Sequence, residues 1–201
     1  MNYPDPIKNL IDNFASLPGI GQKTAERLVF YLLKKGEQEK MIEFGRVLAN
    51  IKKITPPCPE CGNVSENGRC NICSDRKRDK TTLCIVAEAQ DIFYLDKTGA
   101  YNGIYHVLGG LLSTADGITI KDINTEKIMG RILRQHVREV VMGINPTVEG
   151  ESTIIYLKKT LREKFPKIKI TRLSRGLPMG GDLEYADEIT LSNAIKNRSE
   201  V

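Results

Sequence analysis

The sequence predicts a multidomain α/β protein with a helical N-terminal region, a four-cysteine knuckle, an open and mostly parallel sheet, and a C-terminal loop and helix. Three observations predict this order. Apolar residues recur at helical spacing through residues 5–54, two Cys-x2-Cys pairs follow, and short β-branched runs then alternate with helical periods from residue 82. Such alternation is typical of strands that are joined by crossover helices.

Length and charge set broad limits. A chain of 201 residues buries a genuine core and usually forms one or two domains. The net charge of +5 is concentrated in residues 1–80, which carry 14 Lys and Arg against 10 Asp and Glu and so favour a polyanionic partner there. No apolar run approaches the roughly 20 residues that span a bilayer, and the N-terminus lacks the order of a signal peptide. We therefore expect a cytoplasmic protein with no membrane partner.

Three helices are expected in the N-terminal region, at residues 7–14, 22–35 and 37–54. Two prolines, Pro56 and Pro57, end this block. In the third helix four apolar residues keep helical spacing, namely Met41, Phe44, Leu48 and Ile51.

The turn between the first two helices is the best candidate for a phosphate contact. Gly19 and Gly21 have no Cβ, so the backbone can take positive φ and approach a ligand closely, beside the positive end of the next helix dipole. Lys23 and Arg27 add two cations one turn apart. The pattern resembles a helix-hairpin-helix, which binds nucleic-acid backbone without reading bases. The alternative is a helical hairpin whose glycines only make the turn. A core-facing stripe is expected on the opposite face, at Ala25, Leu28, Val29, Leu32 and Leu33.

Four of the five cysteines follow the spacing Cys58-x2-Cys61-x8-Cys70-x2-Cys73. Each pair turns two thiolates toward one point, and two pairs supply the four soft ligands that tetrahedral zinc prefers. Because four cysteines leave no open position for water, we expect structural rather than catalytic zinc. Disulfides are the alternative, which a reducing cytosol disfavours.

The residues around the knuckle have simpler expected roles. Gly62 and Gly68 permit its tight turns, and the fifth cysteine, Cys84, packs as a small buried hydrophobe. The charged run 75–80 is expected to be a solvated connector, with contact between its cations and DNA as the alternative.

From residue 82 the sequence predicts an open α/β sheet. Four short runs rich in β-branched residues are the strand candidates, at residues 83–87, 104–107, 139–144 and 168–172. Helical periods lie between them, at residues 89–97, 125–136 and 148–165.

Polar residues follow two of these strands. Glu88 follows the first strand, and the polar run 145–150 follows the third. Because functional groups of a parallel sheet gather at the carboxyl ends of its strands, the two clusters are expected to converge on one edge. Glu88, Asn145 and Glu149 are the candidate partner-binding residues, the two glutamates forming an acidic patch for a basic partner. The alternative for Glu149 is to cap the helix that begins at residue 148.

A glutamate after the first strand, with a polar cluster ending in glycine after a later one, resembles the Toprim domain of primases and topoisomerases. With the hairpin and the knuckle, further motifs extend the match to essentially the whole chain, which resembles the RecR family of bacterial recombination mediators. These motifs are Gly-Ala-Tyr at 99–101, His-Val-Leu-Gly-Gly at 106–110 and Gly-Leu-Pro-Met-Gly-Gly-Asp-Leu-Glu-Tyr-Ala-Asp-Glu at 176–188.

The resemblance implies a non-enzymatic protein of recombinational DNA repair, which works with RecO and RecF to load recombinase on gapped DNA. Members form ring-like homo-oligomers, dimers or tetramers, that can encircle duplex DNA. Carried over to this sequence, Lys23 and Arg27 face DNA, while Glu149 and neighbouring Toprim residues face RecO. The implied domains are a helix-hairpin-helix DNA-binding domain at 1–55, a zinc finger at 56–78, a Toprim domain at 79–174 and a Walker B-like oligomerisation segment at 175–201.

The residues themselves argue against catalysis. Toprim enzymes hold magnesium with one glutamate and an Asp-x-Asp pair, whereas here Asn145 begins the matching cluster and Glu149 is its only carboxylate. Mg²⁺ binding is therefore not expected at this edge. No Gly-x4-Gly-Lys-Ser/Thr loop accompanies the Walker B-like run 168–173, so an ATPase site is not expected either.

The remaining reactive residues favour structural roles. His106, Ser113 and Asp116 lack the Gly-x-Ser-x-Gly turn of a nucleophilic serine, so His106 is expected to be a hydrogen-bonded core residue. The C-terminal acidic residues either bind a partner or neighbouring subunit or form a solvated loop; they are Asp182, Glu184, Asp187 and Glu188.

Three hypotheses follow. The first is a non-enzymatic mediator that binds DNA through phosphates, with little sequence preference and steep salt dependence. The alternative is a magnesium-dependent Toprim enzyme acting on DNA, such as a nuclease or primase, whose activity Glu88→Gln would abolish. The third is a protein-interaction scaffold in which the hairpin only builds subunit contacts.

Overall fold

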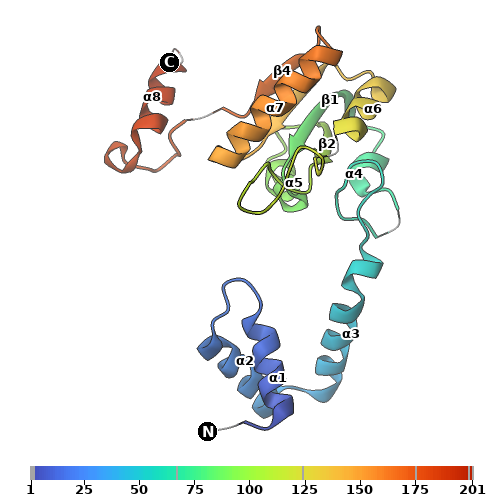
Figure 1. Ribbon diagram of the computed structural model, residues 1–201, viewed down its shortest axis with the longest axis vertical. Coiled ribbons are helices and arrows are strands. Elements are labelled where there is room, and N and C mark those ends of the chain that lie inside the picture. Colours follow the sequence, from blue (N-terminus) through green and yellow to red (C-terminus); the bar gives the residue numbers. More distant parts are fainter. Residues whose placement is uncertain (1–2, 67, 124, 175, 199, 201) are drawn as a thin grey trace. The chain divides into compact units, whose positions relative to one another are not determined.

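The computed structural model describes residues 3–66, 68–123, 125–174, 176–198 and 200, so the expected domain boundary at residue 175 lies outside the described residues. The chain divides into two compact units between Thr55 and Pro56. The expected order of N-terminal helices, four-cysteine cluster, parallel sheet and C-terminal helix is confirmed. Figure 1 shows the helices and strands along the chain.

The first unit consists of three helices, α1 (Asp5–Ala15), α2 (Gln22–Lys35) and α3 (Gln38–Ile54). The helices α1 and α2 pack against each other around a small core. Its buried members are Ile11, Ala25 and Val29, with Ile7, Phe14, Ala15 and Ile20 packed against them.

Two apolar stripes of this unit differ from expectation in their burial. Leu33 of α2 is 59 % exposed, so its expected place in the core is wrong, because the small core is built around α1 and the hairpin and does not extend to Leu33. The stripe on α3 has the expected helical spacing, yet Phe44, Leu48 and Ile51 are all exposed and α3 has no buried residue. Within the described part of the chain, this stripe is not covered.

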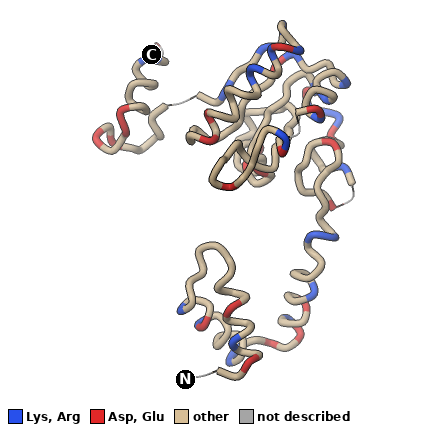
Figure 2. The backbone as a smooth tube through the Cα atoms, viewed as in Figure 1, with Lys and Arg blue, Asp and Glu red and all other residues tan. Residues whose placement is uncertain are grey.

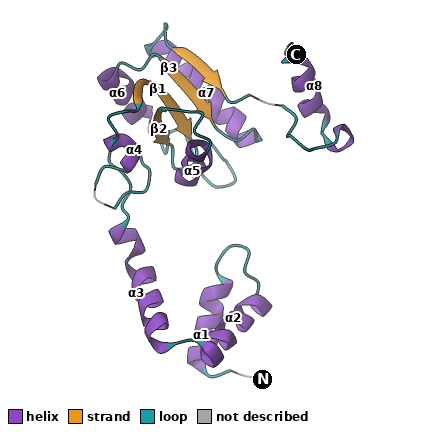
Figure 3. Cartoon of the chain, turned by 180° about the vertical axis from the view of Figure 1, so that it is seen from behind, coloured by secondary structure: helices purple, strands orange, loops and turns teal. Residues whose placement is uncertain are grey.

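The second unit is built on one four-stranded parallel sheet in the order β2-β1-β3-β4. The strands of this sheet are orange in Figure 3. The strands are β1 (Asp79–Val86), β2 (Gly103–Val107), β3 (Glu139–Gly143) and β4 (Lys169–Arg172). The helices that accompany them are α4 (Asn71–Ser74), α5 (Ala89–Lys97), α6 (Thr125–Gln135) and α7 (Val148–Lys164).

Alternating side chains of β1 enter two separate cores, as the period of a strand requires. Leu83 and Ile85 belong to the larger core, to which α6 and α7 contribute Ile128, Ile132, Leu157 and Leu161. Cys84 and Val86 belong to the smaller core, together with Ile92 of α5, Tyr105 of β2 and Ile72 of the knuckle. The helices α6 and α7 therefore cover one face of the sheet, and α5 with part of the knuckle covers the other.

The strand β1 begins at Asp79, four residues before the expected start at residue 83. Its first residues are polar and exposed or half-buried, so they give no apolar signal, but they already pair with neighbouring strands: Asp79 lies opposite Gly103 and Thr82 opposite Glu139. The run 75–80 is therefore only partly a connector.

The C-terminal segment contains a short 3-10 helix, η1 (Leu183–Tyr185), and the helix α8 (Glu188–Lys196). The carboxylate of Asp187 caps α8, because the backbone N–H of Thr190 donates to it at 2.9 Å. This acidic residue thus has a local structural role.

Candidate DNA-contact hairpin, metal centre and sheet edge

The turn between α1 and α2 leaves its backbone open to solvent. Gly19 has a φ of +79°, which favours glycine, and the N–H of Ile20 donates to the carbonyl of Leu17 at 3.1 Å to close the turn. Gly21 instead has extended backbone, so only Gly19 uses positive φ. A Cβ at either glycine would meet nothing within 4 Å, so a ligand can approach the backbone here.

The N-terminus of α2 presents donors and cations together. Its N-cap is Gly21, and among the residues that the structure describes no side chain caps this helix, which leaves the first backbone N–H groups directed outward. Lys23 and Arg27 are both exposed and lie one helical turn apart. The positions of Lys and Arg along the chain are blue in Figure 2. An anion placed at this helix end would meet backbone donors and two positive charges.

The four cysteines of the knuckle meet at one point. Their Sγ atoms all lie within 4.8 Å of one another, and all four residues are buried. Cys61 and Cys70 place their sulfurs 3.5 Å apart, close to the roughly 3.8 Å that Zn–S bonds of about 2.3 Å give in a tetrahedron. None of the four forms a disulfide. The arrangement fits a metal ion held by four thiolates.

Neighbouring groups shift the pKa values of the thiols in this cluster in different directions. A hydrogen bond from Cys61, and further the charge of Arg131, lower the pKa of Cys73 to about 6. Burial instead raises the pKa of Cys70. Four thiolates this close together require a cation between them, because like charges disfavour one another's ionised form.

Several contacts fix the knuckle to the sheet and to α6. The backbone N–H of Val107, the last residue of β2, donates to the carbonyl of Cys61 at 2.8 Å. On α6, the amide of Gln135 donates to Glu60 at 2.6 Å, and Glu60 also forms an ion pair with Arg69 at 2.7 Å. Gly62 and Gly68, which were expected to permit the tight turns of the knuckle, both have positive φ.

Sequence reasoning missed the role of Arg131. It lies on the apolar face of α6 and is fully buried, with Nη2 3.4 Å from the sulfur of Cys73 and Nη1 donating to the carbonyl of Tyr105. The signal was present, since an arginine stands between Met129 and Ile132 in an otherwise apolar helical stripe.

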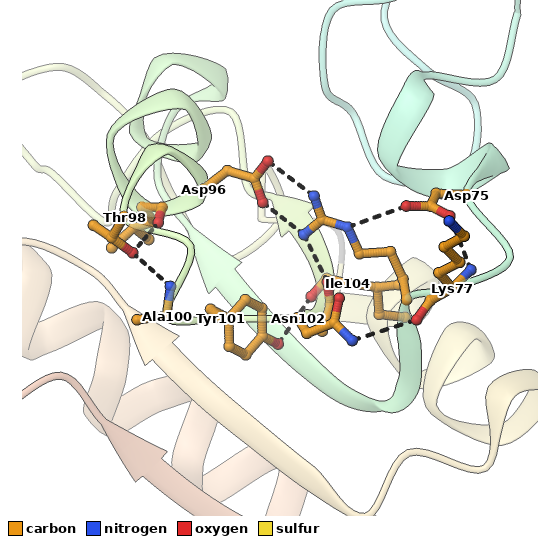
Figure 4. Close-up of polar contacts among 11 residues, drawn as sticks. Asp75, Lys77, Asp96, Thr98, Ala100, Tyr101, Asn102 and Ile104 are labelled. Carbon is orange, nitrogen blue, oxygen red and sulfur yellow. Dashed lines mark hydrogen bonds and ion pairs between the residues drawn. The ribbon is translucent and has the colours of Figure 1, made fainter.

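Arg78 corrects the expectation for the charged run 75–80. Its guanidinium forms two hydrogen bonds to Asp96 of α5, approaches Asp75 at 3.8 Å and lies 3.4 Å from the carbonyl of Gly103 (Figure 4). The Arg78 side chain is only 14 % exposed, so it joins secondary-structure elements and is not a solvated cation.

Glu88, Asn145 and Glu149 lie at the carboxyl edge of the sheet, as the topology requires. Val86 pairs with Gly143 in the parallel register, and Glu88 and Asn145 each follow two residues beyond that pair. Both are exposed, as is Glu149 in the first turn of α7.

The start of α7 is capped by Thr147, whose hydroxyl oxygen accepts from the N–H of Gly150 at 3.1 Å. The side chain of Glu149 is therefore not the N-cap, although it lies where the helix dipole favours a carboxylate. At Gly150 a Cβ would collide with the carbonyl oxygen of Asn145, so this turn requires glycine.

Among the described residues, the four cysteines form the only group of three or more His, Cys, Asp or Glu side chains close enough to hold a metal ion. His106 is buried as expected, but its Nδ1 has no hydrogen-bond partner in the described part of the chain. Ser113 donates to Asp116 at 2.7 Å; Ser113 is half-buried and Asp116 is exposed.

Comparison with known proteins covers the whole chain. Residues 7–51 match the RecR helix-hairpin-helix family, residues 81–174 match the Toprim domain family, and residues 176–199 match the RecR C-terminal family. The chain is 44 % identical to the recombination protein RecR of Staphylococcus haemolyticus and to that of Staphylococcus aureus, and 43 % identical to that of Staphylococcus saprophyticus. Each alignment spans 201 residues and all of both chains. Among the helices formed by the described residues, none has the length and apolar composition to cross a membrane.

Proposed function

This chain belongs to the RecR family of recombination proteins, and from that premise we propose that it is a non-enzymatic mediator of recombinational repair that binds the DNA backbone through its hairpin. The observation that carries the proposal is the exposed start of α2, where uncapped backbone donors stand beside Lys23 and Arg27. Donors of this kind bind phosphate oxygens, which are the same at every base pair. Binding is therefore independent of sequence.

We propose that the protein acts as a ring-like homo-oligomer, a dimer or a tetramer, that encloses duplex DNA. Support comes from apolar side chains that are exposed among the described residues of each unit. On α3 these include Phe44 and Leu48, and in the C-terminal segment Tyr185 and Ile189 are 82 % and 71 % exposed. Large apolar surfaces of this kind mark protein contacts.

RecO and RecF are the proposed partners, with which the protein loads recombinase on gapped DNA. Glu88, Asn145 and Glu149 form the proposed partner-binding edge. Their exposure and shared place at the carboxyl end of the sheet support this role. The work of such a mediator is in the cytoplasm, where reducing conditions keep the cysteine thiols free for metal.

The proposed ion of the four-cysteine site is structural Zn²⁺. When bound, it would supply a fixed cross-link between the two Cys-x2-Cys turns and no open coordination position. The proposed domains keep the expected limits of 1–55, 56–78, 79–174 and 175–201. Catalysis is not part of the proposal, because Asn145 supplies a neutral side chain where Toprim enzymes use a carboxylate.

The proposal is tested by fluorescence anisotropy with a labelled DNA duplex across a salt series. Lys23→Ala/Arg27→Ala is compared with Lys34→Ala/Lys35→Ala, which removes the same charge from exposed positions of the last turn of α2. We expect only the first variant to weaken binding, by about tenfold or more, with a salt slope lower by about 2 for each hairpin that contacts DNA.

Two outcomes would contradict the proposal. Equal binding by the two double variants would show that the hairpin is architectural. Magnesium-dependent conversion of the DNA, abolished by Glu88→Gln, would show that the protein is a Toprim enzyme.

A further inference from the structure

The side chain of Arg131 is an isolated positive charge inside the second unit. It is fully buried on α6, between the sheet and the knuckle. Arginine is almost never fully buried without a charged partner, because the cost of removing its charge from water is large.

The contacts of this guanidinium provide no ordinary counterion. Nη1 donates to the backbone carbonyl of Tyr105, which carries no net charge, and Nε has no partner among the residues described. Within the same residues Arg131 forms no ion pair with a carboxylate. The remaining contact is Nη2, 3.4 Å from the sulfur of Cys73.

A loaded metal centre would supply the missing negative charge. Four thiolates around one divalent cation keep two net negative charges, which in a buried site require compensation. Arg131 is the positive group that contacts a ligand sulfur directly, and a hydrogen bond from it also reduces the electron density on that sulfur.

We propose that Arg131 is the charge partner of the metal–thiolate centre, a positioning residue that strengthens zinc binding and couples occupancy of the knuckle to the stability of the sheet. The inference rests on the proposed zinc centre. The coupling is direct, because one guanidinium contacts the knuckle at Cys73 and β2 at Tyr105 while belonging to α6. Cys73 and Arg131 lie 58 residues apart in the sequence, so the zinc site reaches well beyond its own loop.

The test compares Arg131→Met with Arg134→Met, which removes a charge from an exposed position of the same helix. Zinc content per chain is measured by atomic emission, and affinity by competition with a chromophoric chelator. Thermal melting of each protein is then followed with zinc bound and after its removal.

We expect the parent and Arg134→Met to bind one zinc ion per chain with equal affinity, and Arg131→Met to bind it about 10- to 100-fold more weakly. By linkage, Arg131→Met lowers the melting temperature more in the zinc-loaded protein than in the zinc-free protein. If Arg131 had a purely structural role, its replacement would lower the melting temperatures of the zinc-loaded and zinc-free proteins by the same amount.

If Arg131→Met does not fold, a second pair of variants tests whether the charge of Arg131 strengthens zinc binding. Arg131→Lys keeps the charge and Arg131→Gln removes it, so the lysine variant is expected to keep the higher zinc affinity of the two. Equal impairment of both, or parental affinity in Arg131→Met, would overturn the role of Arg131 and leave the zinc centre intact. A parent protein without zinc affinity would overturn the zinc centre itself, and the inference with it.

Discussion

Arg78 and Asp96 form a two-bond ion pair, with Nη1 2.6 Å from Oδ1 and Nη2 2.9 Å from Oδ2. The pair joins Arg78, the residue that precedes β1, to α5. Figure 4 shows the carboxylate of Asp96 with the two hydrogen bonds that it accepts. Its hydrogen bonds to Asp96 raise the pKa of Arg78, so the guanidinium stays charged at any working pH.

Breaking this pair is expected to destabilise the second unit. Asp96→Asn should lower the free energy of unfolding by about 1–2 kcal/mol, between the values typical of exposed and of buried ion pairs. Glu37→Gln is the control, because the Glu37–Lys40 pair is exposed and should contribute no more than about 0.5 kcal/mol. Urea unfolding measures the free energy of unfolding of both variants. Equally small decreases in Asp96→Asn and Glu37→Gln would contradict the structural role of Arg78.

Metal loading should depend on four of the five cysteines. Cys73→Ser is expected to lose the bound zinc, whereas Cys84→Ala should keep it, since Cys84 packs in the smaller core and is not part of the cluster. Chelation of the metal from the parent should lower its melting temperature, because the binding free energy of such a site is folding free energy. An unchanged melting temperature after verified metal removal would contradict this expectation.

The exposed stripe on α3 should control oligomeric state. Phe44→Asp/Leu48→Asp places two charges in a face that a subunit contact would bury, so the proposed oligomer should dissociate into smaller species. Ile120→Asp is the control, because this isoleucine is also half-exposed but lies outside α3. Sedimentation velocity distinguishes the two, and an unchanged oligomer in the double variant would exclude α3 from the contact.

His106 should make stability depend on pH. Burial, and further the charges of Arg131 and Lys127, lower its pKa to about 4, and Glu60 and Lys127 line the same pocket of about 300 Å³. In the unfolded chain this histidine takes up a proton near its ordinary pKa of about 6.5. The stabilisation that neutral His106 gives the folded state is therefore complete above that pH and is lost as the pH falls toward 4.

Between pH 7.5 and 5 this loss should amount to about 2 kcal/mol. His106→Gln should remove that part of the pH dependence, whereas His136→Gln, at an exposed position, should keep it. Urea unfolding at each pH, with zinc content measured alongside, tests the difference. Parallel pH profiles for the parent and His106→Gln would contradict the assignment.

The sequence predicted every strand and helix of the sheet region to within a few residues, because each has a local apolar period. The start of β1 was missed because pairing, not apolarity, extends it to Asp79. The roles of Arg78 and Arg131 were also missed, since both depend on partners far away in the chain: Asp96 is 18 residues from Arg78, and Cys73 is 58 from Arg131. The apolar neighbours of Arg131 mark it as unusual, but no local pattern identifies the distant partner of either arginine.

In the candidate site, spacing predicted the meeting of the four cysteines, since Cys-x2-Cys turns are local. The positions of Glu88 and Asn145 on one edge followed from the parallel order of β1 and β3. The cap at Thr147 was not foreseen, because a threonine at the N-cap and a glutamate in the first turn can each stabilise the start of a helix.

The order β2-β1-β3-β4 also has a consequence for synthesis of the protein. The first strand to leave the ribosome, β1, is a central strand, and both of its hydrogen-bonding edges need partners that are translated later. β2 can pair with one edge once residue 107 has emerged. The other edge stays unpaired until β3, which ends at residue 143, has been synthesised. Until then the nascent chain carries an unpaired apolar strand edge, which is the kind of surface that chaperones bind and that aggregates if translation stalls.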